Sequence, residues 1–544
     1  MFRFKDFLNR KKIRKFVPCS IYFLDFMKRI LLPFGLLSIT ACNDTAHDAE
    51  RPNVLLIYAD DIGYGDLSCY GTSAVETPNV DKLASEGILF TNAHCAAATS
   101  TPSRYAMLTG EYAWRREGTG IAAGNAAMVI NPERYTIADM FKDAGYNTGV
   151  VGKWHLGLGS ETGKQDWNGH VRPNPCDLGF DYSYIMAATA DRTPCIYMEN
   201  GRGVGLDPSD PVYVSYTENF PGEPTGKDNP ELLRIHPSQG HDQSIVNGIP
   251  RIGFMKGGKK ALWKDENIAD SIAINAIRFI ERSVREDEPF FLYLATNDIH
   301  VPRVPNERFA GKSGLGPRGD AILSFDWTVG EVMKTLERLG LDEKTIVILS
   351  SDNGAIIDDG YHDQAAELLG NHKPTGVFRG GKYSIYEGAS RVPCILRWKG
   401  KVLPGSSESL MSQLDWIASF AGMFGVEIPS GAAPDSADNL ESWFDSNASG
   451  RSYMVTQNLQ NNLSITDGVW KYIPAAEGPA TEFYTGMELG NNISEHQLYN
   501  LKEDPSESVN VHEFNQEKSK ELRSELIQII QSGAHYKSLE EVGF

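Results

Sequence analysis

Clustered cysteines are missing from this chain. Its seven cysteines stand far apart between positions 19 and 394, and no two of them form a CxxC pair. A zinc site or a redox-active dithiol usually relies on such pairs, so both are disfavoured. The spacing does not suggest a disulfide framework either.

Positive charge is also scarce. The 544 residues include 52 Lys and Arg against 71 Asp and Glu, a formal net charge of −19. No basic stripe accompanies this acidic balance, so we expect no binding to nucleic acid. An anionic ligand would need its own local cluster of Lys, Arg or metal.

Long hydrophobic runs are lacking apart from one apolar stretch near the amino terminus, which is short for a membrane span. This stretch, MKRILLPFGLLSITAC at 27–42, begins with two basic residues after its Met and ends in small residues, the layout of a signal peptide. Its ending resembles a bacterial lipobox in which Cys42 is lipidated. We predict a signal region over 1–42, with the true start at Met27, and a polar tether over 43–50.

This amino terminus predicts an exported bacterial lipoprotein, in the periplasm or at the outer membrane or cell surface. The membrane would then be contacted only through the lipid anchor. The alternative is a simple secreted protein in which the cysteine occurs by chance.

The rest of the composition is that of a globular protein, with 41% hydrophobic and 10% aromatic residues. Four apolar runs of strand length are each followed by charged or amide residues, and helical patterns precede the later runs. Continuous apolar runs that alternate with helices predict buried parallel strands. Because ligands bind beyond the carboxyl ends of such strands, we expect the four polar clusters to converge on one site. The runs are 53–58, 148–151, 289–295 and 345–349, and the helical patterns are 137–144, 269–285 and 325–339.

The composition also predicts two domains. Residues 51–425 would form the larger α/β domain, interrupted by a Gly-, Pro- and Asp-rich insertion at 200–262 that shapes a substrate cleft. Small and polar residues around 425–450 mark a boundary. Beyond it, 426–544 would form a smaller α+β domain with a short antiparallel sheet. Its expected elements are strands near 452–456, 469–473 and 495–501 and a helix at 517–531.

One motif points to a family. The run STPSRYAMLTG at 100–110 resembles the signature of formylglycine-dependent sulfatases, here a serine-type bacterial member. The segments DDIGYGDLSCYG, GKWHLG, SSDNG and RGGKYSIYEGASRVP stand in the order seen in these enzymes. The resemblance, to arylsulfatases and N-acetylgalactosamine-6-sulfatases, implies an alkaline-phosphatase-like fold with a large mixed, mostly parallel sheet flanked by helices.

The resemblance implies that Ser100 is oxidised to formylglycine by an anaerobic sulfatase-maturating enzyme, and that Arg104 orients the modified residue. A hydrated aldehyde carries two hydroxyls on one carbon. One can attack sulfur, and the other lets the sulfated intermediate collapse to aldehyde and free sulfate. An unmodified serine could form the ester but could not expel sulfate in this way.

A metal site is expected beside this residue. Asp60, Asp61, Asp352 and Asn353 offer only hard oxygen ligands, which suit Ca²⁺ or Mg²⁺ and disfavour zinc. The family resemblance assigns these four positions to Ca²⁺, with Ser100 completing the site.

Cations and histidines complete the expected catalytic set. Lys153 and His155 are two residues apart, so in an extended segment they share one face. By resemblance, Lys153 and Lys382 bind the sulfate, His155 is the base that collapses the intermediate, and His300 protonates the leaving oxygen.

The substrate is less well specified. Asp191 and Arg192 form a pair suited to holding sugar hydroxyls, with a structural ion pair as the alternative. His372 and Arg379 are further candidates for substrate binding. His236 and His241 in the insertion could also contact substrate, but we interpret them as loop histidines.

We predict an exo-acting sulfatase that removes 6-O-sulfate from galactose or N-acetylgalactosamine of host glycans. Two alternatives remain open. One is a formylglycine phosphodiesterase or phosphonate hydrolase. The other is a glycan-binding lipoprotein without catalysis, which would follow if Ser100 is not converted.

Overall fold

The computed structural model describes residues 51–72, 74–491 and 493–533. The predicted signal region and tether, including Met27 and Cys42, lie outside the described residues. No helix in the described part of the chain is long and apolar enough to cross a membrane.

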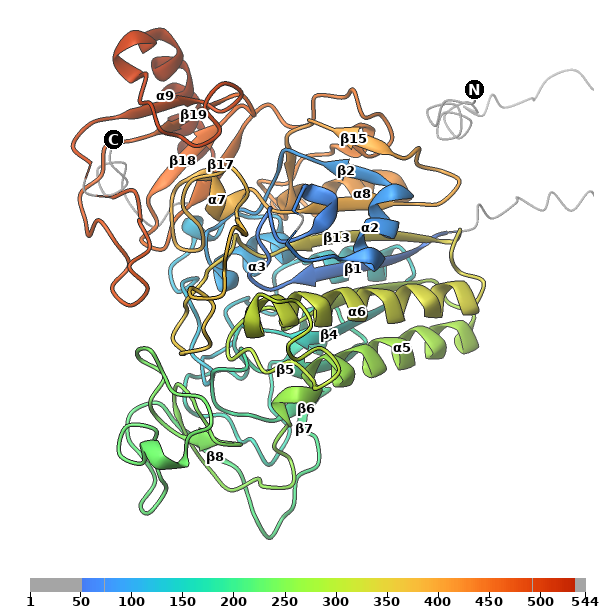
Figure 1. Cartoon of the computed structure of the whole chain (residues 1–544). Helices are drawn as coiled ribbons and strands as arrows, with labels where there is room; N and C mark the ends of the chain where they lie inside the picture. Colours follow the sequence, from blue (N-terminus) through green and yellow to red (C-terminus); the bar gives the residue numbers. More distant parts are fainter. Residues whose placement is uncertain (1–50, 73, 492, 534–544) are drawn as a thin grey trace, which may run out of the picture. The chain divides into compact units, whose positions relative to one another are not determined.

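A ten-stranded mixed sheet forms the centre of the fold (Figure 1). Its middle is a block of parallel strands in which β1 is paired on both sides, so that Leu55 faces Leu292 on one neighbour and Val347 on the other. All seven residues of β1 are buried, as the continuous apolar run predicts. The parallel block is β13 (Thr345–Ser351), β1 (Asn53–Ala59), β12 (Phe290–Ala295), β4 (Asn147–Lys153) and β5 (Tyr182–Met186).

Shorter strands extend both edges of this block. On one side the order continues through β14 (Cys394–Arg397), β2 (Ile88–Phe90) and β15 (Gly405–Ser407), and on the other through β6 (Tyr197–Glu199) and β7 (Arg202–Gly203). The β14, β6 and β7 pairings are antiparallel. The predicted fold class, a large mixed sheet flanked by helices, is confirmed.

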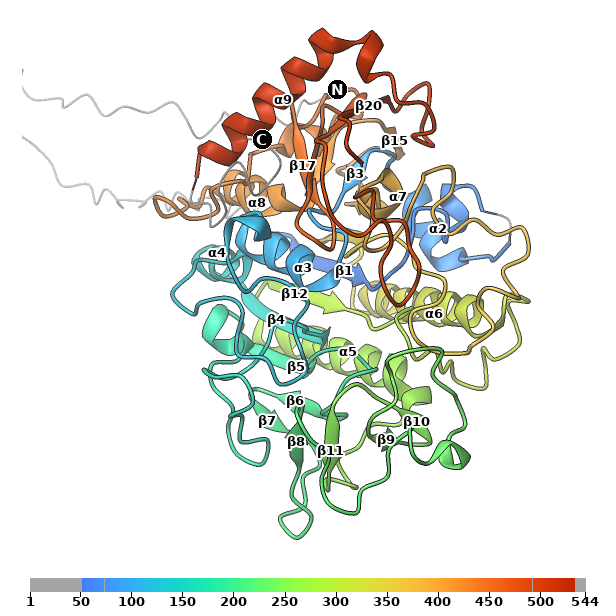
Figure 2. The same ribbon diagram turned by 90° about the vertical axis from the view of Figure 1, so that its left-hand side faces the viewer.

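Helices cover both faces of the sheet. On one face α5 (Ile268–Glu286) and α6 (Gly316–Arg338) lie side by side (Figures 1 and 2), and Phe279 of α5 packs against Phe290 with ring centres 6.2 Å apart. On the other face, Phe141 of α4 (Ile137–Asp143) stacks on Phe291 at 4.0 Å. Consecutive strand residues point to opposite faces of a sheet. The neighbours Phe290 and Phe291 of β12 therefore join the sheet to the helices on both of its faces.

Helix α6 begins at Gly316 rather than at 325, where the apolar pattern begins. The first turns of the helix carry Arg318 and Asp320, which are buried despite their charge. Arg318 binds both carboxylate oxygens of Asp66 at 2.7 Å, and Asp320 accepts hydrogen bonds from backbone N–H groups of 311–313. Hydrogen-bonded charged side chains take the place of apolar contacts in these turns. Hydrophobic periodicity therefore could not reveal this part of the helix.

The carboxyl-terminal part contains a separate four-stranded antiparallel sheet, and helix α9 (Gln516–Gln531) packs against it (Figure 2). Leu522, Leu526 and Ile530 of α9 are buried in one apolar cluster with residues of this sheet. The expected short antiparallel sheet is present, with one strand, β18, that the sequence pattern did not indicate. Its strands are β17 (Met454–Gln457), β18 (Leu463–Thr466), β19 (Trp470–Ile473) and β20 (Gln497–Asn500).

The segment predicted as an insertion is mostly irregular, which agrees with its Gly- and Pro-rich composition. It contains two small antiparallel pairs, β8 (Tyr213–Ser215) with β11 (Phe254–Lys256) and β9 (Ile245–Val246) with β10 (Ile249–Pro250).

Candidate active site

A cavity of about 320 Å³ lies at the carboxyl ends of the parallel strands. Most of its lining comes from three parts of the chain that are distant in sequence. They are the start of α3 with the loops near the strand ends, the segment around 239–252, and a hairpin at 480–489. The lining residues from the first part include Ser100, His155, Asp191, Arg192, His300, Asp359, Lys382 and Tyr383. The other two parts contribute Gln239, Gly240, His241 and Ile252, and Glu482, Tyr484 and Thr485.

Ser100 is the first residue of α3 (Ser100–Thr109), a helix whose ten residues are all buried. Its hydroxyl accepts a hydrogen bond from Lys153 Nζ at 2.8 Å and donates to Asn353 Oδ1 at 3.3 Å. The helix amino terminus adds a partial positive charge at this point. A nucleophile or an anion placed here is therefore stabilised both by the lysine and by the helix.

Arg104 lies one turn further along α3 and is fully buried. Its Nε and Nη2 atoms lie 2.9 and 2.8 Å from Asp352 Oδ2, and its Nη1 donates to the Tyr293 hydroxyl at 2.9 Å. Burial alone would raise the pKa of Asp352, but Arg104 and Lys153 outweigh it and hold that pKa well below its usual range. Arg104 thus keeps Asp352 ionised and fixes its orientation under Ser100.

Four oxygen-bearing side chains meet next to Ser100 because β1 and β13 pair in register up to Ala59 and Ser351. The residues that follow these strand ends are Asp60 and Asp61, and Asp352 and Asn353. The Asp61 backbone N–H donates to Asp352 Oδ1 at 3.2 Å, and Asn353 Nδ2 donates to Asp61 Oδ1 at 2.7 Å.

This cluster fits a hard divalent cation. The Oδ2 atom of Asp60 is buried and has no hydrogen-bond partner among the described residues. Burial raises the pKa of Asp60 well above its usual value, although Lys153 opposes the shift. A cation such as Ca²⁺ would satisfy such an oxygen and offset the cost of burying several carboxylates together.

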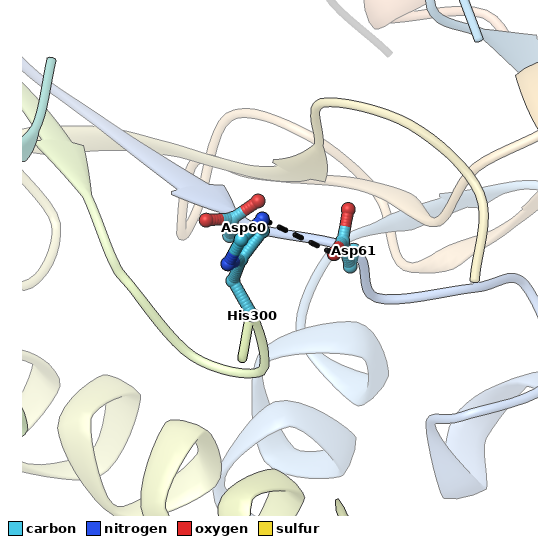
Figure 3. Close-up of side chains that lie close together, drawn as sticks. All are labelled: Asp60, Asp61 and His300. Atoms are coloured by element: carbon cyan, nitrogen blue, oxygen red, sulfur yellow. Dashed lines mark ion pairs between the residues drawn. The ribbon is translucent and has the colours of Figure 1, made fainter. Parts of the chain in front are cut away.

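His300 lies beside the acidic pair Asp60 and Asp61, as Figure 3 shows. Asp60, Asp61 and His300 each offer a potential ligand atom within 4.8 Å of the others. The His300 Nε2 atom is 3.9 Å from Asp61 Oδ2, which is longer than a hydrogen bond. The oxygen-rich set with Asn353 suits Ca²⁺ better than a site that includes the imidazole.

Lys153 and Lys382 bring two buried ammonium groups to the site. Lys153 Nζ lies 2.7 Å from Asp60 Oδ1 and 3.5 Å from Asp352, and burial lowers its pKa below the usual value. Lys382 Nζ lies 2.9 Å from Asp61 Oδ2 and 2.7 Å from Asp359 Oδ2. Burial would lower the pKa of Lys382, but the two carboxylates raise it well above its usual value.

The two predicted catalytic histidines both line the cavity, each with one ring nitrogen committed to a backbone carbonyl. His155 Nε2 lies 3.0 Å from the Ala122 oxygen, and its Nδ1 has no partner among the described residues. His300 Nδ1 lies 2.8 Å from the Val301 oxygen. A carbonyl can only accept, so in each ring this contact fixes the N–H and turns the other nitrogen to the site.

Burial is the main influence on both histidines. It lowers the pKa of His155 and of His300 well below the usual range, and the neighbouring Lys153 and Lys382, respectively, add to the effect. Burial therefore favours the neutral form of both rings.

Asp191 and Arg192 are brought to the cavity as expected. Their charged groups are 3.1 Å apart, and Arg192 also donates to the Thr189 hydroxyl at 2.7 Å. His241 Nε2 lies 3.0 Å from Asp191 Oδ2. His241 lies in a loop, as interpreted, and it also lines the cavity, which agrees with the alternative that it contacts substrate. His236 is not among the lining residues.

His372 and Arg379 do not line this cavity, and their role in substrate binding stays a prediction. His372 Nε2 lies 2.8 Å from Asp66, within the buried Asp66–Arg318 pair. Arg379 pairs with Glu488 at 3.0 Å. Both side chains are occupied by contacts that hold loops together.

Sequence reasoning missed Asp359 and Tyr383 as site residues. Asp359 accepts from Lys382 at 2.7 Å and from the Tyr383 hydroxyl at 2.8 Å. Tyr383 takes a positive φ of 82°, which a non-glycine residue rarely adopts. Asp359 lies in an irregular loop with no periodic pattern, and only its nearness to SSDNG in the sequence could have indicated it.

Comparison with known proteins identifies the family. The sulfatase family model matches residues 52–426. The chain belongs to the sulfatase family. As a member it is a sulfuric ester hydrolase, and the predicted resemblance is confirmed.

Individual relatives span almost the whole chain. An N-acetylgalactosamine-6-O-sulfatase from Bacteroides thetaiotaomicron is 53% identical over 507 residues, covering 92% of this chain and 98% of the relative. Human arylsulfatase A is 29% identical over 475 residues, covering 85% and 84%. One solved structure belongs to work on the metabolism of multiple glycosaminoglycans by Bacteroides thetaiotaomicron, and its sequence is 53% identical to this chain. The match covers 89% of this chain and 100% of the other, with a TM-score of 0.87.

Proposed function

We propose that this sulfatase removes 6-O-sulfate groups from terminal galactose or N-acetylgalactosamine residues of host glycans. The observation that carries the proposal is the meeting of Ser100, two buried lysines and two histidines around one acidic cluster, next to a cavity that Asp191 and Arg192 also line. The 53% identical relative is an N-acetylgalactosamine-6-O-sulfatase, which supports the choice of sugar and position.

Two groups would complete the site. Formylglycine at residue 100 supplies, in its hydrated form, a nucleophilic hydroxyl and a second hydroxyl that permits sulfate release. Asp60, Asp61, Asp352 and Asn353 would hold Ca²⁺ beside residue 100, where its charge offsets that of the bound sulfate.

The remaining steps belong to the side chains. Lys153 and Lys382 flank the position of the sulfate and stabilise the negative charge of the transition state. Their carboxylate partners keep both ammonium groups in place before substrate arrives.

His300 has Nε2 free of the backbone contact and would protonate the leaving sugar oxygen. His155, whose Nδ1 has no hydrogen-bond partner among the described residues, would remove a proton during sulfate release. A bound sulfate ester places a negative charge beside His300 and favours its protonated form, which offsets the lowering of its pKa by burial.

Asp191 and Arg192 would grip hydroxyls of the sulfated sugar, with His241 holding the carboxylate. The cavity of about 320 Å³ is near the lower end of the ligand-site range, which suits one sulfated sugar ring and an exo mode of action.

A substrate panel tests the proposal. Purified enzyme would be given 2-, 3-, 4- and 6-sulfated galactose and N-acetylgalactosamine, together with an aryl sulfate and an aryl phosphate. We expect sulfate release from the 6-sulfated sugars and the aryl sulfate. Activity confined to 3- or 4-sulfated sugars would refute the position, and preferential phosphate release would favour the phosphonate hydrolase alternative.

The proposal includes the maturation and location of the enzyme. Conversion of Ser100 requires an anaerobic sulfatase-maturating enzyme as partner, and Cys42 would carry a lipid anchor that keeps the exported protein at the membrane.

A further inference from the structure

A hairpin from the carboxyl-terminal part forms one rim of the cavity, although it comes from outside the matched family region. It is closed by a backbone bridge between Thr481 and Glu488, and Glu482, Tyr484 and Thr485 line the cavity. The catalytic machinery uses none of these residues.

The hairpin tip is rigidly held. The Glu482 carboxylate accepts hydrogen bonds from the N–H groups of Tyr484 and Thr485 at 2.8 and 2.6 Å and from the Thr485 hydroxyl at 2.9 Å. Arg379 fastens the other end of the hairpin through Glu488. Because these contacts already order the hairpin tip, binding a ligand there would cost little conformational entropy.

Two aromatic side chains stand exposed at this tip. Phe483 is 88% exposed and Tyr484 is 55% exposed, and their rings pack edge to face with centres 5.0 Å apart. Exposed single apolar residues are common, but an adjacent aromatic pair at the rim of a polar cavity is a feature of ligand sites.

Tyr484 also reaches across to the insertion. A Cβ added at Gly240 would lie only 3.4 Å from the Tyr484 ring, so the ring packs over the bare backbone of that glycine. The tyrosine therefore bridges the hairpin and the insertion at the cavity entrance, with one part of its surface still open to solvent.

The size of the cavity limits how much of a glycan it can hold. A volume of about 320 Å³ accommodates one sugar ring, so the next ring of a glycan must lie at the entrance. The C–H face of a sugar ring is apolar and gains by covering an aromatic ring, while the tyrosine hydroxyl remains available to sugar hydroxyls.

Resting on the proposed function, we propose that Tyr484, with Phe483 beside it, binds the sugar adjacent to the sulfated one. The natural substrate is then a sulfated oligosaccharide rather than a monosaccharide. The enzyme prefers the oligosaccharide because only its second sugar can contact the hairpin.

The test compares kcat/KM on two substrates that share the reacting sugar. One is 6-sulfated N-acetylgalactosamine, and the other is an oligosaccharide with that sugar at its non-reducing end. For Tyr484→Ala we expect the ratio of oligosaccharide to monosaccharide kcat/KM to fall about tenfold, and Tyr484→Phe should retain most of the wild-type ratio because the ring remains.

Phe514→Ala is the matched control. Phe514 is 87% exposed in the same part of the chain but does not line the cavity, so its removal should leave the ratio unchanged. Equal losses on both substrates for Tyr484→Ala, or no loss on either, would overturn the inference while leaving the proposed function intact. A wild-type enzyme that releases sulfate from the aryl sulfate but from neither sugar would overturn both.

Discussion

At the scale of single residues, Lys153 connects Ser100 to the acidic cluster. Its ammonium group contacts Ser100, Asp60 and Asp352, and no water-exposed surface remains on it. A buried charge with three polar partners is stable only because those partners are themselves anionic or oriented. The same contacts hold a cation beside Ser100, where we propose that the sulfate binds.

Lys153→Met should lower kcat/KM on an aryl sulfate by at least about 100-fold, because the transition state loses one buried cationic donor. The exposed Lys164 provides a control, and Lys164→Met should retain wild-type activity. Steady-state kinetics and circular dichroism on both variants make the comparison, and a Lys153→Met enzyme with near-wild-type kcat/KM and native spectra would contradict the assigned role.

At the scale of elements, buried ion pairs join the carboxyl-terminal sheet to helix α7 (Glu387–Ser390). Lys471 on β19 lies 3.1 Å from both Glu387 and Glu507. Burial, together with the repulsion of Glu387, raises the pKa of Glu507 to about 7, against the opposing effect of Lys471. The junction therefore contains a carboxyl group that titrates near neutral pH.

This shift predicts a pH dependence of stability. A carboxyl group whose pKa is higher in the folded state than in the unfolded state binds more protons when folded, so its contribution to stability is lost as pH rises from about 4.5 to about 7. Glu507→Gln removes that titration. Its Tm relative to wild type should rise by a few degrees between pH 5 and pH 8, and a Tm difference that stays constant across this range would argue against the assignment.

Gly360 packs against His241, a residue of the insertion whose ring contacts Asp191. A Cβ at this glycine would lie 2.0 Å from the His241 ring, and the residue has a φ of 109°. Gly360→Ala should displace His241 from Asp191. We expect KM for a 6-sulfated sugar to rise about tenfold while aryl sulfate turnover changes much less, and equal losses on both substrates would indicate a general folding defect instead.

The sequence predicted those parts of the fold that buried apolar runs specify. Strands β1, β4, β12 and β13 could be placed within a few residues, and with them the polar groups at their carboxyl ends. The hairpin at 480–489 and Asp359 could not be predicted, because irregular loops carry no periodic signal and their contacts depend on the tertiary structure. The contact of His372 with the buried Asp66 could not be predicted either, because the sequence does not reveal which residue the loop brings to it.

At the scale of the whole molecule, the acidic cluster joins strands, helix α3 and the loop of Lys382 around one point. Several carboxylates buried together are costly without a compensating cation. Removal of metal should therefore affect the stability of the protein as well as its activity.

Treatment with a chelator should lower the Tm by several degrees and abolish sulfate release, and added Ca²⁺ should restore both. Asp61→Asn should show a much smaller Tm response to Ca²⁺. If the Tm of the wild-type protein is the same with chelator and with Ca²⁺, the cluster does not hold the ion.

The central claim is that Ser100 becomes the formylglycine nucleophile of a sulfatase. The most direct measurement is mass spectrometry of the tryptic peptide 83–104, taken from active enzyme produced in an anaerobic host that carries the maturating enzyme. We expect a mass lower by two hydrogens, located at Ser100. An unmodified serine in enzyme that releases sulfate would contradict the account.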